Sequence, residues 1–383
     1  MQQKLRIVIM INLNYRLSMY VYVCLCVFNC TCICLAFRNG WIKAENVIPE
    51  LKDADMIQNI LQTLKKRKFE YIIDALYMAK KKWDFNKEEA SEPCGVFDES
   101  VLNEENLVDD ERAEELYRAG VEYMKCAVRF YSEKYADKFV YLPFNQVMNI
   151  HRINSAVYDL ATSETLGHIA ASLLLHNTVR LYQTALFLKD ETSINIQTEW
   201  HRDLTMVPLD TREGGSLTFW CPLLRTLSHT NNDSMLRFIA GSHRDLSREH
   251  WYGSDYAEST TYSQAHSLDV GDCTIHHGWV KHYAPPQTKE NSRLAIGFTY
   301  VIGDATVLND FPADTSNRYT SFKDEDEYSY RDWIQDLKGG DVIDHPLLPV
   351  VFNKRIVQPQ KAMYQKREFE EDIPDIYLYE SFV

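Results

Sequence analysis

Residues 180–188 read Arg-Leu-Tyr-Gln-Thr-Ala-Leu-Phe-Leu. Apolar and β-forming side chains dominate this run, which predicts a buried strand. Similar short runs occur further along the chain, at residues 216–221, 235–239, 272–275 and 293–301. Gly-Gly, Gly-Ser, Gly-Asp and Pro-Pro steps separate them as turns. Many short strands with turn signals between them indicate a β-sandwich or a jelly roll.

The chain before these strands has helical periodicity instead. The spacing of apolar residues predicts helices over 57–83, 111–135 and 166–175. We therefore expect a mainly β core with flanking helices, an α+β arrangement. Beyond Gly303 the chain is aromatic, acidic and weakly patterned, which favours an extension that wraps around the core.

Composition and charge exclude two broad classes of protein. The 383 residues include 41 Lys and Arg against 55 Asp and Glu, a net charge of −14. Nucleic-acid binding needs a concentrated basic surface to meet the phosphates, so we expect no nucleic-acid partner. With 45% apolar and 12% aromatic residues, the chain is also too hydrophobic to be disordered.

An apolar stretch at residues 17–37 carries no charged residue and follows a basic flank. As a helix it would be about 31 Å long, close to the thickness of a bilayer's hydrocarbon core. This predicts a signal peptide or signal anchor within residues 1–42, with membrane attachment through 17–37 and a secretory, endomembrane or organellar destination. The alternatives are a leader cleaved on import elsewhere, or a mis-assigned start before Met19; the alternative location is the cytoplasm.

Cysteines divide between this stretch and the body of the protein. Five of the nine lie within residues 17–37, where they act as small hydrophobes or lipidation sites. The body keeps four widely spaced cysteines without a CxxC pair: Cys94, Cys126, Cys221 and Cys273. This spacing predicts neither a zinc site nor a disulfide framework.

Metal-binding chemistry is concentrated among the predicted strands. Residues 200–203 read Trp-His-Arg-Asp, and on an extended chain His201 and Asp203 point to the same side. A third ligand has to come from another strand, and His282 lies at a predicted strand end before a turn. Two histidines and one carboxylate form the facial donor set of non-haem Fe(II) oxygenases. Arg293, eleven residues after His282, begins the next predicted strand and could hold a dicarboxylate with its planar fork.

His276 and His277 are rival candidates for the third ligand. They lie in the predicted strand just before His282, and by alternation only one of them can face the interior. A role as a packed or pocket-wall histidine is the competing interpretation for both.

At this point the sequence resembles the phytanoyl-CoA dioxygenase-like (PhyH) family of Fe(II)/2-oxoglutarate-dependent oxygenases. The similarity covers roughly residues 166–305, in family order and spacing. The matching stretches are 180–189, Trp200-His-Arg-Asp203, 217–223, 236–243, Gly271-Asp-Cys-Thr-Ile-His-His-Gly278 and the segment from His282 to Arg293.

The resemblance implies a role for each matching residue. His201, Asp203 and His282 are implied to be the Fe(II) ligands, and Arg293 to pair with the distal carboxylate of 2-oxoglutarate. Lys189 matches a lysine common in the family at the end of a core strand, which implies a role with the cosubstrate or the substrate. The spacing to Arg293 favours His282 over its two rivals.

The implied fold is a double-stranded β-helix, a cupin-like jelly roll, with N-terminal helices. We expect residues 43–165 to be the helical N-terminal part of the catalytic domain, 166–305 the jelly-roll core and 306–383 the C-terminal wrapping extension. The implied cofactors are Fe(II), 2-oxoglutarate and O2. The implied activity is a dioxygenase that hydroxylates a small organic or acyl substrate and releases succinate and CO2. A catalytically silent jelly-roll protein that binds a ligand or partner is the alternative.

Overall fold

The fold is seen in a computed structural model of the chain. It describes residues 6–8, 39–64, 91, 93–101, 110–134, 145–189, 198, 200–210, 215–224, 235–244, 267–285, 293–309, 330–334 and 336–354.

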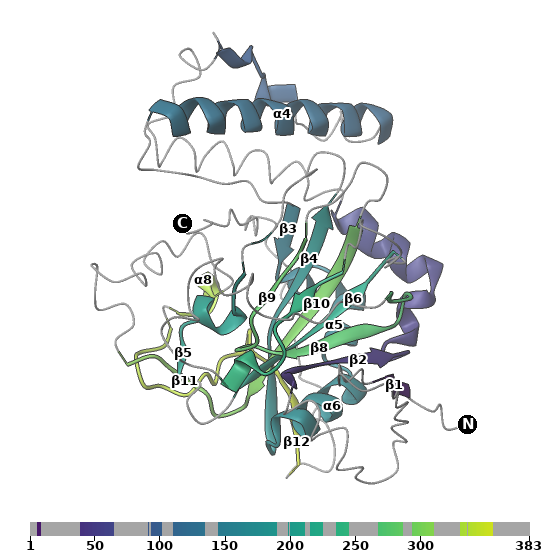
Figure 1. The fold of residues 1–383 in the computed structure, drawn as a ribbon, viewed down its shortest axis with the longest axis vertical. Helices are drawn as coiled ribbons and strands as arrows, with labels where there is room; N and C mark the ends of the chain where they lie inside the picture. The colour runs from purple at the N-terminus through teal and green to yellow at the C-terminus, as the bar shows by residue number, and fades with distance from the viewer. Residues whose placement is uncertain are drawn as a thin grey trace.

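An antiparallel sheet of eight strands forms the core (Figure 1). Its strands follow the order β1-β2-β8-β6-β10-β4-β12, and β3 pairs with β4 beside this path. Their bounds are β1 (Arg6–Val8), β2 (Trp41–Glu45), β3 (Asn145–Met148), β4 (Thr178–Lys189), β6 (Ser216–Pro222), β8 (Cys273–His277), β10 (Arg293–Ile302) and β12 (Val350–Asn353). All pairings are antiparallel.

Two short ladders accompany this sheet. One pairs β7 (Arg237–Phe238) with β9 (His282–Tyr283), and the other pairs β5 (Leu209–Asp210) with β11 (Thr306–Val307). A further bridge joins His201 to His282, so the His-Arg-Asp segment lies along β9. The predicted β core of jelly-roll type with flanking helices is confirmed.

Strand β10 lies at the centre of the sheet between β4 and β6, and all ten of its residues are buried. Side chains alternate between the two faces of a strand. Leu294, Ile296, Phe298 and Tyr300 therefore share one face and belong to the main apolar core. Arg293, Ala295, Gly297 and Thr299 share the other face. The sheet thus separates an apolar side from a side with polar groups.

Helices α5 (Ser155–Ala161) and α6 (Glu164–Leu174) contribute buried side chains to the same apolar core. The hydroxyl of Tyr300 on β10 donates to the carbonyl of Ala161 over 2.8 Å, which fixes α5 to the sheet. Asn154 and Ser163 accept backbone N–H groups at the two helix starts, so each helix begins with a side-chain cap.

The remaining helices are α4 and several short ones. Helix α4 (Asp110–Lys134) lies beyond the β3 end of the sheet in Figure 1. Among the described residues the others include a helix at 54–64, η1 (Pro49–Lys52), η2 (Glu99–Val101), η4 (Ile150–Arg152), η6 (Asp203–Met206), η7 (Ser242–Arg244) and α8 (Arg331–Ile334).

Most predicted elements are present. Helix α4 and helix α6 match the predicted helices at 111–135 and 166–175 closely. The helix predicted at 57–83 is seen from 54 to 64, and its remainder lies outside the described residues. The strand predicted at 235–239 shortens to the two residues of β7. The sheet also takes in β1, β2, β3 and β12, which come from outside residues 166–305.

The spacing of the body cysteines predicts no disulfide framework, and this prediction is wrong. Cys94 and Cys126 form a disulfide, with their Cα atoms 5.6 Å apart and a separation of 32 positions in sequence. Helix α4 carries Cys126 to Cys94, which lies at the end of a short helical segment just before Gly95, and linear spacing gives no sign of such a contact. Cys221 and Cys273 remain as buried free thiols.

The apolar stretch at 17–37 lies outside the described residues. Among the residues that are described, no helix combines the length and apolar character needed to cross a bilayer.

Candidate metal centre

The backbone brings the predicted ligands together through one short pairing. His201 N donates to His282 O over 2.9 Å, and His282 N donates to His201 O over 3.0 Å. This reciprocal pair places the two side chains opposite one another, with ring centroids 4.3 Å apart. The chain then turns into η6, whose first residue is Asp203. His201 therefore lies in the bridged segment beside β9, and Asp203 lies two residues later where η6 begins.

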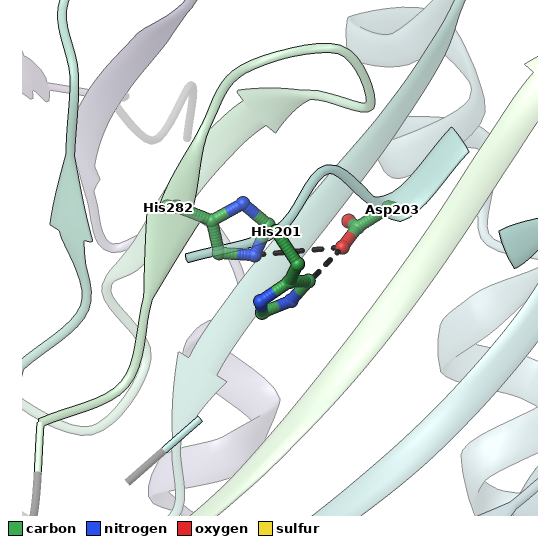
Figure 2. A group of neighbouring side chains, drawn as sticks. All are labelled: His201, Asp203 and His282. Carbon is green, nitrogen blue, oxygen red and sulfur yellow. Dashed lines mark ion pairs between the residues drawn. The ribbon is translucent and has the colours of Figure 1, made fainter. Parts of the chain in front are cut away.

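The imidazole nitrogens of both histidines lie near one carboxylate oxygen of Asp203. Oδ1 of Asp203 lies 3.4 Å from Nε2 of His282 and 3.7 Å from Nε2 of His201. Figure 2 shows both imidazoles turned toward this oxygen. One atom from each of the three residues lies within 4.8 Å of the other two. Two imidazole nitrogens and one carboxylate oxygen suit a divalent iron and leave coordination positions for further ligands.

The protonation states at the site also suit a metal. Nδ1 of His282 lies 3.1 Å from the carbonyl oxygen of Val280, so Nδ1 carries the proton and Nε2 keeps its lone pair. Burial lowers the pKa of His282 to about 4, and the Asp203 charge only partly offsets this. Burial raises the pKa of Asp203, but His282, His276 and His201 together hold it well below its usual range. At neutral pH the imidazole of His282 is therefore neutral and the carboxylate of Asp203 is ionised.

The second oxygen of Asp203 has its own partners. Thr218 Oγ1 donates to Oδ2 over 3.0 Å, and Nε2 of His276 lies 3.3 Å from the same atom. The hydroxyls of Thr218 and Thr299 lie 3.1 Å apart. Thr218 and Thr299 were not among the residues predicted for the site. Threonine is common in strands, so nothing in the sequence separates these two from structural threonines.

The two rival histidines face opposite ways, as strand alternation requires. His276 is buried at the site, with its ring 4.6 Å from that of His282. His277 accepts the backbone N–H of Trp279 at Nδ1, and its ring lies against Gly215. Only His276 reaches Asp203, and it does so at the oxygen that faces away from His201 and His282.

Arg293 and Lys189 lie side by side at the end of the polar face. They are direct cross-strand partners on β10 and β4, and both side chains are buried. The Arg293 guanidinium carbon lies 5.8 Å from the centre of the Trp220 ring. Lys189 Nζ donates to the carbonyls of Ala284 and Pro285 over 3.3 and 3.1 Å. Burial and then the Arg293 charge lower the pKa of Lys189 to about 6. Lys189 therefore ties β4 to the segment that follows His282.

A sequence model of the phytanoyl-CoA dioxygenase (PhyH) family matches residues 38–295 of the chain. This match covers strands β2, β3, β4, β6 and β8 of the main sheet, the three converging ligands and Arg293. The chain belongs to the phytanoyl-CoA dioxygenase family. The cofactor set of this PhyH protein is the one predicted above, Fe(II) with 2-oxoglutarate and O2 as cosubstrates, and the donor set of the site fits it.

Several solved structures are similar to this PhyH protein. The non-heme alpha ketoglutarate dependent epimerase SnoN from nogalamycin biosynthesis is 16% identical, with 83% of this chain and 96% of that chain covered and a TM-score of 0.47. The carbocyclase SnoK from the same biosynthesis is 19% identical, with 60% and 86% covered and a TM-score of 0.41. EctD from S. alaskensis is 18% identical, with 44% and 61% covered and a TM-score of 0.38. Among curated protein sequences, none matches this chain.

Proposed function

We propose that this PhyH protein is an Fe(II)- and 2-oxoglutarate-dependent dioxygenase that hydroxylates a small organic or acyl substrate, with release of succinate and CO2. One observation carries the proposal: Nε2 of His201 and Nε2 of His282 both face Oδ1 of Asp203. His201, Asp203 and His282 would hold the iron. When bound, the metal supplies the activation of O2, chemistry that amino-acid side chains do not provide.

The presence of Asp203 favours hydroxylation over halogenation. A carboxylate in the ligand set occupies the position that a halide would otherwise need. Because the pKa of Asp203 lies well below its usual range, the carboxylate keeps its charge across the neutral and mildly acidic range. The net charge that it brings to the metal is therefore constant over the conditions of an assay.

Arg293 supports the proposal from the far end of the same face of the sheet. A guanidinium can bind the distal carboxylate of 2-oxoglutarate with two parallel hydrogen bonds. Burial of Arg293 makes such a contact stronger than it would be in water. Trp220 lies beside the guanidinium and limits the directions in which it can turn.

An apolar wall keeps water from one side of the site. Phe238 stacks near His282 and His276, with ring centroids 5.8 and 5.3 Å away. It belongs to a buried cluster with Trp41, Trp220 and Val280, among others. A dry wall strengthens the electrostatic interactions inside a site and protects reactive species from side reactions.

An anaerobic titration with Fe(II) and 2-oxoglutarate, followed by succinate assays in air, tests the proposal. The substrate panel should contain acyl-CoA thioesters, free carboxylic acids and small cyclic metabolites. We expect saturable binding of both Fe(II) and 2-oxoglutarate, and succinate release that a substrate stimulates. Asp203→Ala is the matched inactive control.

Two results would contradict the proposal. Failure of the natural chain to bind Fe(II) would remove its basis. The natural chain could also bind Fe(II) and 2-oxoglutarate tightly but release no succinate, neither with a substrate nor as slow background turnover without one. That result would favour the catalytically silent jelly-roll protein instead.

A further inference from the structure

A row of side chains crosses the sheet directly beneath Asp203. Thr299 on β10 is the cross-strand partner of Thr218 on β6, and Thr218 is the partner of His276 on β8. Direct partners project from the same face of a sheet. Three neighbouring strands therefore each present one hydrogen-bonding side chain at the same level, on the face that carries the site.

Two members of this row contact a single atom, Oδ2 of Asp203. Thr218 Oγ1 donates to it over 3.0 Å, and His276 Nε2 lies 3.3 Å away. Since the Thr218 proton points to Asp203, the 3.1 Å contact between the two threonines is donated by Thr299. The contacts thus run in one direction, from Thr299 through Thr218 to the carboxylate.

The hydrogen-bonding role of His276 follows from its surroundings. Its side chain is 1% exposed, and Nδ1 has no hydrogen-bond partner among the residues that the structure describes. Nε2 is the nitrogen that faces Oδ2 of Asp203, and a carboxylate oxygen only accepts hydrogen bonds. The proton therefore lies on Nε2, and His276 is a donor to Asp203. A donor nitrogen has no lone pair to offer a metal.

We propose that His276 is a positioning residue, which together with Thr218 holds Oδ2 of Asp203 so that Oδ1 alone is presented to the iron. The inference rests on the proposed function and explains why a buried histidine lies beside the ligands without joining them. Without these donors the carboxylate could rotate or turn both oxygens to the metal. Partners that orient ligands in this way typically change metal affinity by about 10–100-fold.

Two substitutions at one position separate donation from packing. His276→Phe keeps a ring of similar size but removes the donor, and His276→Gln keeps an N–H near the position of Nε2. We expect the Fe(II) dissociation constant, measured anaerobically without 2-oxoglutarate, to rise about 10–100-fold in His276→Phe. We expect His276→Gln to restore most of this loss. Thr218→Val, which removes the second donor, should raise the constant by about tenfold.

His277→Phe is the matched control, because His277 lies on the same strand but faces away from Asp203. Its Fe(II) dissociation constant should equal that of the natural chain. The proposal is overturned if folded His276→Phe and His276→Gln bind Fe(II) equally well, since packing alone would then account for His276. It is also overturned if His276→Gln abolishes binding while His282→Ala binds normally, because His276 would then be a ligand.

The measurement also distinguishes this inference from the proposed function. The Fe(II) dissociation constant requires no turnover. A natural chain that binds Fe(II) but forms no succinate would refute the proposed dioxygenase activity. The Fe(II) dissociation constants of His276→Phe and His276→Gln would still decide the role of His276.

Discussion

The two faces of the main sheet have opposite chemistry, and β10 contributes to both. On the helix side, Leu294, Ile296 and Phe298 pack into a core that α5 and α6 complete. On the site side, the same strand carries Arg293 and Thr299. All of these residues are buried, so solvent exposure does not distinguish the faces. The helix side is mostly apolar, whereas the site side carries the guanidinium of Arg293 and the hydroxyl of Thr299.

This difference separates stability from chemistry. Burial of apolar side chains stabilises the fold, and the loss of one from a packed core leaves a cavity. The site face instead holds polar groups whose orientation matters more than their buried area. Substitutions on the helix side should lower stability and spare the site. Substitutions on the site side should impair metal or cosubstrate binding and leave most of the stability unchanged.

Asp203→Ala should have the largest effect of any substitution on the site side. It removes the only carboxylate of the candidate ligand set, and we expect Fe(II) binding and turnover to be abolished while the fold remains. Isothermal titration with Fe(II) and a thermal unfolding curve together check this. Retained iron binding in a folded Asp203→Ala protein would contradict the ligand assignment.

Phe298→Ala is the corresponding change on the helix side. Phe298 is fully buried in the main core, and truncation of such a side chain costs about 3–5 kcal/mol of the free energy of unfolding. Urea denaturation measures the loss. The fraction that remains folded should bind Fe(II) with unchanged affinity; a matching loss of iron affinity would show that the two faces are not independent.

Arg293→Lys tests the site side away from the iron. Lysine keeps the charge but loses the two-pronged contact with a carboxylate. Loss of a buried charged hydrogen-bonding pair costs about 2–5 kcal/mol, so the affinity for 2-oxoglutarate should fall at least tenfold. Iron affinity should barely change. An unaltered KM for 2-oxoglutarate would refute the role of Arg293.

Lys189 gives the site side a dependence on pH. Its pKa is about 6 in the folded protein, against an ordinary value of 10.5, so between these values the unfolded chain binds the extra proton. Stability should therefore rise with pH across this range and lose the dependence below about pH 6, where both states are protonated. Lys189→Met should reduce the slope by at most about 1.4 kcal/mol per pH unit. Urea denaturation of both proteins at pH 7, 8 and 9 measures how the free energy of unfolding changes with pH. Equal slopes for the two proteins would refute the prediction.

Ser163→Ala should have the smallest effect. Ser163 Oγ accepts the N–H of Leu166 at the start of α6, on the helix side. Loss of such a cap costs about 1 kcal/mol. The change should appear as a small fall in Tm, with Fe(II) affinity as the unchanged control. A reduced Fe(II) affinity would mean that α6 influences the site across the sheet.

Much of the sheet could be predicted because β4, β6 and β10 are runs of β-forming residues bounded by turns. Strand β2 could not, because it directly follows the apolar stretch and its partner β8 is more than 200 residues away. Strands β7 and β9 have two residues each, too few for a period. Strand β12 lies in a tail whose pattern is weak, yet it pairs with β4.

The candidate ligands were easier to predict than their supports. His201 and Asp203 are two residues apart, and His282 lies at a fixed distance before Arg293. The contact of His276 with Asp203 depends on the register between β6 and β8, which local sequence does not determine. The sequence could limit His276 and His277 to one inward-facing residue, but it could not choose between them.

The disulfide between Cys94 and Cys126 has a consequence for how the protein is prepared. A crosslink that closes a loop of this length typically contributes about 2–4 kcal/mol. Disulfides persist in oxidising compartments and are rare where glutathione and thioredoxin keep thiols reduced. Protein made in a reducing bacterial cytosol and protein exported through an oxidising compartment would then be covalently different molecules. A Tm measured on one preparation would not describe the other.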